Sequence, residues 1–108
     1  MQTLVQVLSS HRRSLRDLIV NDRRLSKFHL AVVTEKKPGR PHGWAKLHSL
    51  NKNGQGAINM EWHQATKMLI CRVITKGSGR PNIIIGDFVD YLLACHRTKI
   101  GTISISPR

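Results

Sequence analysis

Short apolar runs, each closed by a polar or Gly/Pro-rich segment, constrain the fold of this chain more than any other feature of its sequence. They are six to eight residues long and contain β-branched or aromatic side chains, as β-strands do. The runs are residues 28–34, 44–50, 57–62, 68–75 and 100–106. The Asn and Gly residues at 51–56 predict a hairpin loop between two of them. A helix over residues 61–74 is a competing interpretation, because this segment also contains helically spaced apolar residues.

Two other stretches have the three-and-four spacing of amphipathic helices. In residues 3–20 the apolar positions follow this spacing, and Arg12, Arg13 and Arg16 lie on the opposite face. In residues 83–96 the apolar side chains again fall on one side of a helix. These patterns predict one helix at the start of the chain and a second near its end.

The order of these elements predicts an α+β fold. We expect an N-terminal amphipathic helix, an antiparallel sheet of about four to five strands, a second helix near the C-terminus and a final strand. The helices are expected to pack on one face of the sheet. With 108 residues the chain has room for one hydrophobic core, so we expect residues 1–108 to form a single compact domain.

A large excess of positive charge is the strongest functional signal. Eighteen Lys and Arg stand against six Asp and Glu, which gives a formal net charge of +12 at pH 7. The first 54 residues carry eleven basic and three acidic side chains, a net charge of +8, and the remainder carries seven and three, a net charge of +4. Such an excess attracts polyanions through its long-range field and through counterion release. We therefore expect a nucleic acid, DNA or RNA, as the partner, contacted mainly by the N-terminal half.

Cysteine use and hydropathy bear on the compartment. Cys71 and Cys95 have no CxxC spacing, which argues against a disulfide-stapled scaffold and is typical of a reducing compartment. No stretch approaches the roughly 18 consecutive apolar residues of a membrane span. At the N-terminus the apolar residues precede the positive charges, the reverse of a secretory signal. We expect a cytoplasmic protein with no membrane partner.

The most informative loop spans residues 36–43, which are basic and rich in Gly and Pro. Its Gly-Arg-Pro core at 39–41 resembles the AT-hook, a motif in which an extended backbone lays Arg along the minor groove of A·T tracts. A second Gly-Arg-Pro stands at 79–81. The resemblance implies an Arg contact with DNA from an extended chain, whereas the alternative interpretation is a Gly/Pro turn with solvated Lys and Arg side chains.

Basic side chains of these segments are the candidate contacts with nucleic acid. Phosphate contacts position a protein on its partner without reading sequence. Trp44 and Trp62 are candidates for stacking on bases, and core packing is the alternative role for both. The predicted nucleic-acid-binding residues are Arg12, Arg13, Arg16, Arg23, Arg24, Lys27, Lys36, Lys37, Arg40 and Arg80.

Catalytic and metal-binding groups are sparse. None of the six histidines forms HxxxH or HExxH, so we expect no metal and no cofactor. Six acidic residues are few for the clustered carboxylates of a metal-dependent nuclease. A metal-independent ribonuclease needs only side chains such as His, Glu and Arg, and His63, Glu61 and Arg72 are the candidates for one. We expect a non-catalytic protein and keep the small ribonuclease as an alternative.

Two further kinds of partner remain open. A protein-interaction module would use the same basic surface to dock on an acidic protein. A homodimer would form through an unpaired sheet edge or an apolar helix face, and would widen the basic surface.

Overall fold

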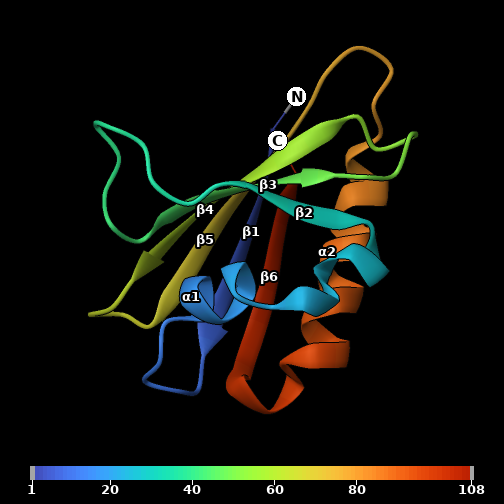
Figure 1. Ribbon diagram of the computed structural model, residues 1–108. Helices are drawn as coiled ribbons and strands as arrows, with labels where there is room; N and C mark the ends of the chain where they lie inside the picture. Colours follow the sequence, from blue (N-terminus) through green and yellow to red (C-terminus); the bar gives the residue numbers. More distant parts are fainter. Residues whose placement is uncertain (1, 108) are drawn as a thin grey trace.

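A six-stranded antiparallel sheet organises the chain, with its strands in the order β2–β3–β4–β5–β1–β6 (Figure 1). The computed structural model describes residues 2–107. The strands are β1 (Gln2–Ser9), β2 (Leu30–Thr34), β3 (Trp44–Ser49), β4 (Gly56–His63), β5 (Met68–Thr75) and β6 (Ile100–Pro107). The edges of the sheet are β2 and β6, whereas β1 lies inside it, between β5 and β6.

The prediction of an N-terminal helix over residues 3–20 is wrong, and so is the prediction of four to five strands. Thr3, Val5 and Val7 are buried and alternate with more exposed residues, which is the period of two of a strand. This segment is a strand because β5 and β6 hydrogen-bond to it on both sides. Of the predicted helix, only residues 15–20 are helical.

Two α-helices and two 3-10 helices join these strands. They are α1 (Leu15–Val20), η1 (Arg23–Phe28), α2 (Pro81–Cys95) and η2 (Arg97–Lys99). The first of them begins after Ser14, whose Oγ accepts a hydrogen bond from the Asp17 amide at 3.2 Å. The helix predicted at 83–96 corresponds to α2, which starts two residues earlier at Pro81, a residue suited to a first helical turn. The competing helix over 61–74 is absent, because most of these residues belong to β4 and β5.

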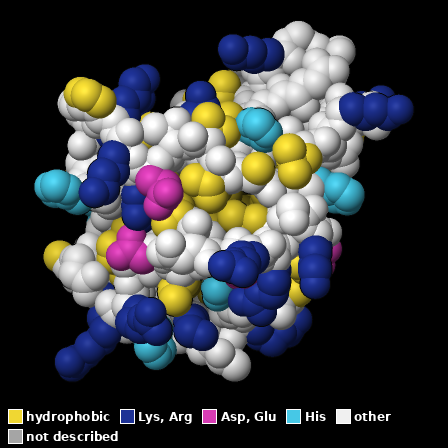
Figure 2. All heavy atoms as spheres, viewed as in Figure 1, with side chains coloured by type: hydrophobic (Ala, Val, Ile, Leu, Met, Phe, Trp, Pro, Cys, Tyr) yellow, Lys and Arg dark blue, Asp and Glu magenta, His cyan; other side chains and the backbone are white. Residues whose placement is uncertain are grey.

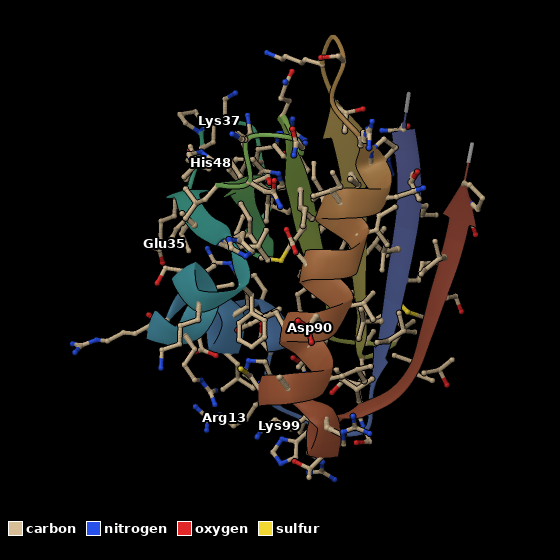
Figure 3. The ribbon with its side chains drawn as sticks, turned by 90° about the vertical axis from the view of Figure 1, so that its right-hand side faces the viewer. Arg13, Glu35, Lys37, His48, Asp90 and Lys99 are labelled. Atoms are coloured by element: carbon tan, nitrogen blue, oxygen red, sulfur yellow. The ribbon has the colours of Figure 1, made fainter. Side chains whose placement is uncertain are left out.

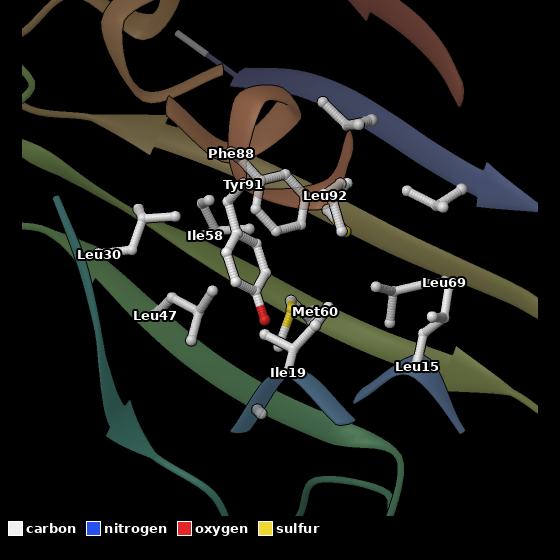
Figure 4. Packing of buried hydrophobic residues seen from close by; sticks show 14 of the residues in the cluster. Leu15, Ile19, Leu30, Leu47, Ile58, Met60, Leu69, Phe88, Tyr91 and Leu92 are labelled. Carbon is white, nitrogen blue, oxygen red and sulfur yellow. The ribbon is translucent and has the colours of Figure 1, made fainter. Parts of the chain in front are cut away.

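One face of the sheet is covered by α1, η1 and α2, and the hydrophobic core lies between these helices and the strands (Figures 1 and 4). Full burial of a large apolar side chain contributes about 1.5–3 kcal/mol to stability. The side chains that meet in Figure 4 include Leu15, Ile19, Leu30, Leu47, Ile58, Met60, Leu69, Phe88, Tyr91 and Leu92, all of them fully buried. The chain is therefore a compact α+β domain with a single core.

The opposite face of the sheet has no helix over it within residues 2–107. Along β3, β4 and β5 the side chains alternate between buried apolar residues on the helix-covered face and less buried residues on the opposite face. Polar and charged side chains such as Lys46, Asn59 and Arg72 therefore lie on this uncovered face. It is where a ligand can approach the sheet directly.

Candidate nucleic-acid interface

A groove crosses the uncovered face of the sheet over β3, β4 and β5. It consists of two adjoining hollows of about 570 and about 600 Å³, which share Asn59 and Ile74 in their linings. We call it the open-face groove. Its lining includes Gln2, Arg40, Trp44, Lys46, His48, Asn59, Glu61, His63, Ile70, Arg72, Ile74 and Lys76.

The charge of the open-face groove is strongly one-sided. Four of its lining residues are Lys or Arg, and Glu61 is the one acidic residue among them. The Glu61 Oε2 atom lies 2.7 Å from the His63 Nε2 atom, so this carboxylate already has a partner. On the other side of the molecule, α2 carries two acidic side chains, of which Asp90 is exposed (Figure 3). A polyanion therefore meets less like charge in the groove than over α2.

A loop at one edge of the groove, residues 35–43, consists of tight turns. The Arg40 amide donates to the Lys37 carbonyl at 3.1 Å, and Gly39 has a positive φ of 82° inside this turn. A second turn leads into β3 at Trp44. The loop has the folded form of a Gly/Pro turn, so the extended backbone implied by the resemblance to the AT-hook is not present.

Arg40 lies over the indole ring of Trp44 at the edge of the open-face groove. The guanidinium carbon is 5.2 Å from the ring centroid, the geometry of a cation–π contact. Trp44 is only 4% exposed, and its Nε1 atom is buried without a hydrogen-bond partner. The planar guanidinium, with the indole beneath it, is therefore the group that faces a ligand at this edge.

Gly43 allows the loop to approach β4 closely. Its carbonyl accepts a hydrogen bond from the Trp62 amide at 2.9 Å. A Cβ atom at this position would lie 2.4 Å from the Trp62 carbonyl oxygen, well inside any normal contact. The Trp62 indole itself packs in the core, where its Nε1 donates to Gln64 Oε1 at 2.8 Å. Of the two tryptophans, only Trp44 therefore belongs to the groove.

Arg16 is buried, unlike the other nine predicted contact residues. Its Nε donates to the Trp44 carbonyl at 3.1 Å, its Nη1 to Asp17 Oδ1 at 2.8 Å, and its Nη2 to the Glu35 carbonyl. These bonds tie α1 to the start of β3 and to the loop at residues 35–43. The guanidinium of Arg16 is hydrogen-bonded within the protein and is not available to a ligand, so this residue does not belong to the candidate interface.

The nine exposed residues divide between the groove and the rest of the surface. Lys36, Lys37 and Arg40 lie on the loop at the groove edge. The others are Arg12 and Arg13 in the loop before α1, Arg23, Arg24 and Lys27 on η1, and Arg80 at the start of α2.

Lys46, Arg72 and Lys76 also line the groove, although none of them is among the ten predicted nucleic-acid-binding residues, and Arg72 was named only for the alternative ribonuclease. Lys46 lies between the buried Ala45 and Leu47 on β3, and Arg72 lies on β5 between buried residues in the same way. A basic side chain at such a position must point away from the core. This alternation was the available signal for Lys46 and Arg72, and no comparable signal marked Lys76.

A third hollow, of about 500 Å³, lies on the helix-covered side, among α1, η1 and the end of α2. Arg13 and Lys99 line it and lie near each other at the lower end of Figure 3. Figure 2 shows Lys and Arg side chains gathered toward this end of the molecule. Asp17 and Asp22 also line the hollow, and each is paired with an Arg. This hollow is therefore more nearly neutral than the open-face groove.

A buried polar cluster connects η1 to the end of α2. The Tyr91 hydroxyl donates to Asp22 Oδ2 at 2.8 Å and lies 2.8 Å from His96 Nε2, which is itself 3.2 Å from Asp22 Oδ2. Arg24 donates to both Asp22 carboxylate oxygens, at 2.8 and 2.9 Å. Because the Tyr91 hydroxyl donates to Asp22, its oxygen is left to accept a hydrogen bond from Nε2–H of His96. The other ring nitrogen of His96, Nδ1, is buried without a partner.

The pKa values of this cluster follow from burial and from these bonds. Burial alone would raise the pKa of Asp22, but hydrogen bonds from Arg24 and Tyr91 outweigh it and lower that pKa far below its usual range. Burial lowers the pKa of His96. The Asp22 carboxylate opposes this shift, but burial, together with the charges of Arg24 and Lys99, outweighs it. Burial, together with the Asp22 carboxylate, raises the pKa of Tyr91. The cluster therefore holds a charged Asp22 and a neutral His96.

Comparisons with known proteins returned no match, whether to a protein-family model, a curated protein or a solved structure. Residues 2–107 contain no group of three or more His, Cys, Asp or Glu side chains arranged to hold a metal ion. In the same part of the chain, no helix combines the length and apolar character needed to cross a bilayer. The open-face groove and its charge are thus the features from which function is inferred.

Proposed function

We propose that the protein binds single-stranded nucleic acid along the open-face groove. The observation that carries this proposal is a groove whose lining is both strongly basic and partly apolar. Arg40 on the loop, Lys46 on β3 and Arg72 on β5 supply positive charge. On β5, Arg72 lies between Ile70 and Ile74, which line the same groove.

Each part of the groove suits one part of a single strand. Lys and Arg side chains contact phosphates, and the stacked pair of Arg40 and Trp44 offers a flat surface to a base. The Asn59 amide, on the groove floor, supplies a donor and an acceptor for base edges. A single strand exposes the faces of its bases for stacking, whereas a duplex exposes only base edges in its grooves, and this favours single strands as the partner.

The net charge of +12 assists this binding from a distance. Exposed residues away from the groove, such as Arg23 and Lys27 on η1, add to the field that attracts the strand. We expect them to affect the rate of encounter more than the bound contacts.

The proposal is tested by measuring the affinity for fluorescein-labelled single-stranded RNA, single-stranded DNA and a duplex over a series of salt concentrations. Affinity should fall as salt rises, because phosphate contacts release counterions. Replacing Lys46 and Arg72 with Ala should make the slope of log affinity against log salt shallower by about 1.4, because each phosphate of a single strand that a basic side chain neutralises adds about 0.7 to that slope.

The matched control replaces Arg23 and Lys27 with Ala, which removes the same charge from the other side of the molecule. This double variant should keep the slope of the wild-type protein. Absence of binding at low salt would overturn the proposal, and equal effects of the two double variants would show that the groove is not the binding surface.

A further inference from the structure

Glu61 and His63 form an exposed acid–imidazole pair within the open-face groove. They are two residues apart on β4, so both side chains lie on the same face of the sheet. The Glu61 Oε2 and His63 Nε2 atoms are 2.7 Å apart. The side chains of Glu61 and His63 are 37% and 42% exposed, so the pair is open to a ligand in the groove.

Two guanidinium groups flank this pair. On one side Glu61 stands opposite Trp44 in the pairing of β3 with β4, and Arg40 lies over the Trp44 ring. On the other side Arg72 stands opposite Asn59 in the pairing of β4 with β5, which makes it the diagonal neighbour of Glu61. All of these side chains line the same hollow of about 570 Å³. A phosphate in this hollow would meet both Arg side chains and the imidazole.

We propose that this group cleaves single-stranded RNA without a metal ion, an activity that rests on the proposed binding of nucleic acid in the groove. Glu61 accepts a hydrogen bond from Nε2–H of His63 and so leaves Nδ1 of the neutral imidazole as the basic nitrogen. Glu61 is in this scheme a positioning residue, and it also stabilises the imidazolium as that ion forms.

The reaction is a transesterification at one phosphodiester. The ribose 2′-hydroxyl gives its proton to His63 Nδ1, and its oxygen forms a bond to phosphorus. The bond between phosphorus and the 5′-oxygen breaks, and the 5′-oxygen takes a proton from water. The hydroxide produced takes the proton from His63, so that no net proton is consumed. Arg40 and Arg72 stabilise the negative charge that grows on the non-bridging oxygens. The products are a 2′,3′-cyclic phosphate and a 5′-hydroxyl.

The exposure of the pair allows its chemistry to be tested separately from its effect on the fold. An exposed pair of polar side chains contributes little to stability, so substitutions at Glu61 and His63 should leave the fold intact, and a thermal melt checks this. His11 is an exposed histidine in the loop between β1 and α1, outside the open-face groove. The variant His11→Ala is therefore a matched control for His63→Ala.

The experiment incubates a labelled single-stranded RNA with each protein in the presence of EDTA and measures the 2′,3′-cyclic phosphate product. We expect cleavage by the wild-type protein and by His11→Ala, and a loss of about 10²- to 10⁴-fold in His63→Ala. An RNA methylated at its 2′-oxygens should be bound and not cleaved. The variant Glu61→Gln should lower kcat and leave the KM for RNA unchanged, because an amide stabilises the imidazolium formed in the reaction less than a carboxylate does.

Purifying all variants in parallel separates this activity from a contaminating ribonuclease, since contamination would give equal cleavage by the wild type and His63→Ala. That result, or bound RNA that stays intact with the wild-type protein, overturns the inferred cleavage and leaves the proposed binding standing. Failure to bind RNA at low salt overturns both.

Discussion

Replacing Tyr91 with Phe tests whether the buried cluster of Asp22, Tyr91 and His96 stabilises the fold. The substitution removes one hydroxyl and keeps the ring, which is fully buried and meets Phe28 edge to face. The hydroxyl donates to a charged carboxylate at 2.8 Å and lies at the same distance from His96 Nε2. A hydrogen bond to a charged group contributes about 1.5–3 kcal/mol when its partner stays buried.

The contacts that Asp22 keeps in Tyr91→Phe determine how much stability is lost. Arg24 still donates to Asp22, and His96 Nε2 stays 3.2 Å from Asp22 Oδ2, so the carboxylate keeps two partners. We therefore expect the free energy of unfolding to fall by about 2 kcal/mol, near the lower part of the range for charged groups. For a domain of this size the melting temperature should fall by roughly 10 °C.

The assay is urea denaturation near neutral pH, followed by circular dichroism. The dependence of the free energy on urea should stay the same, because the ring still fills its site and the same surface is exposed on unfolding. Asp22→Asn is the comparison, since it removes the charge while keeping the shape, and it should destabilise at least as much. A loss below about 0.5 kcal/mol for Tyr91→Phe would refute the view that the hydroxyl is a structural link.

Three further predictions concern pH, the groove and its edge. Because the pKa of His96 is lowered in the folded protein, the unfolded chain binds the proton more readily, so the free energy of unfolding should decrease as the pH falls below about 6.5. Urea denaturation of His96→Gln should lack this part of the decrease. In Trp62→Phe, Trp44 is the remaining tryptophan. Its fluorescence should change on binding of single-stranded nucleic acid, because the bound strand moves Arg40 relative to the Trp44 ring. An unchanged spectrum at saturation would mean that the strand binds away from Trp44. Gly43→Ala should lower the melting temperature, because the new Cβ would clash with the Trp62 carbonyl oxygen.

The spacing of apolar residues in the sequence predicted those strands and helices in which the apolar residues are also the buried ones. The strand at 68–75 has the bounds of β5, and the helix at 83–96 differs from α2 by only a few residues. For residues 2–9 the prediction failed for a physical reason. Leu4 and Leu8 occupy the uncovered face of β1, while Val5 and Val7 lie on the other face. Because both faces carry apolar residues, the sequence has apolar positions three and four residues apart, the spacing expected of a helix. Residues 2–9 form a strand because they pair with β5 and β6, which lie far away in the sequence.

The candidate site was harder to predict, because it depends on which side chains the sheet brings to one face. The prediction favoured basic residues that are clustered in the sequence. It therefore included Arg16, which is buried, and omitted isolated basic residues such as Lys46. The set of His63, Glu61 and Arg72 was named from its chemistry alone, and the pairing of β4 with β5 gathers it into one hollow. The register between strands determines which side chains lie together, and a single sequence does not reveal it.

The position of β1 has a consequence for how the chain reaches its folded state. β1 is synthesised before the other strands, yet it sits between β5 and β6, and β6 is synthesised after all of them. Until then one backbone edge of β1 has no partner, and the apolar side chains of that strand are available for incorrect pairing. Contacts between residues so distant in sequence slow the search for the native arrangement. We therefore expect the sheet to close only after β6 has left the ribosome, and a chain truncated before Ile100 to aggregate rather than form a smaller stable domain.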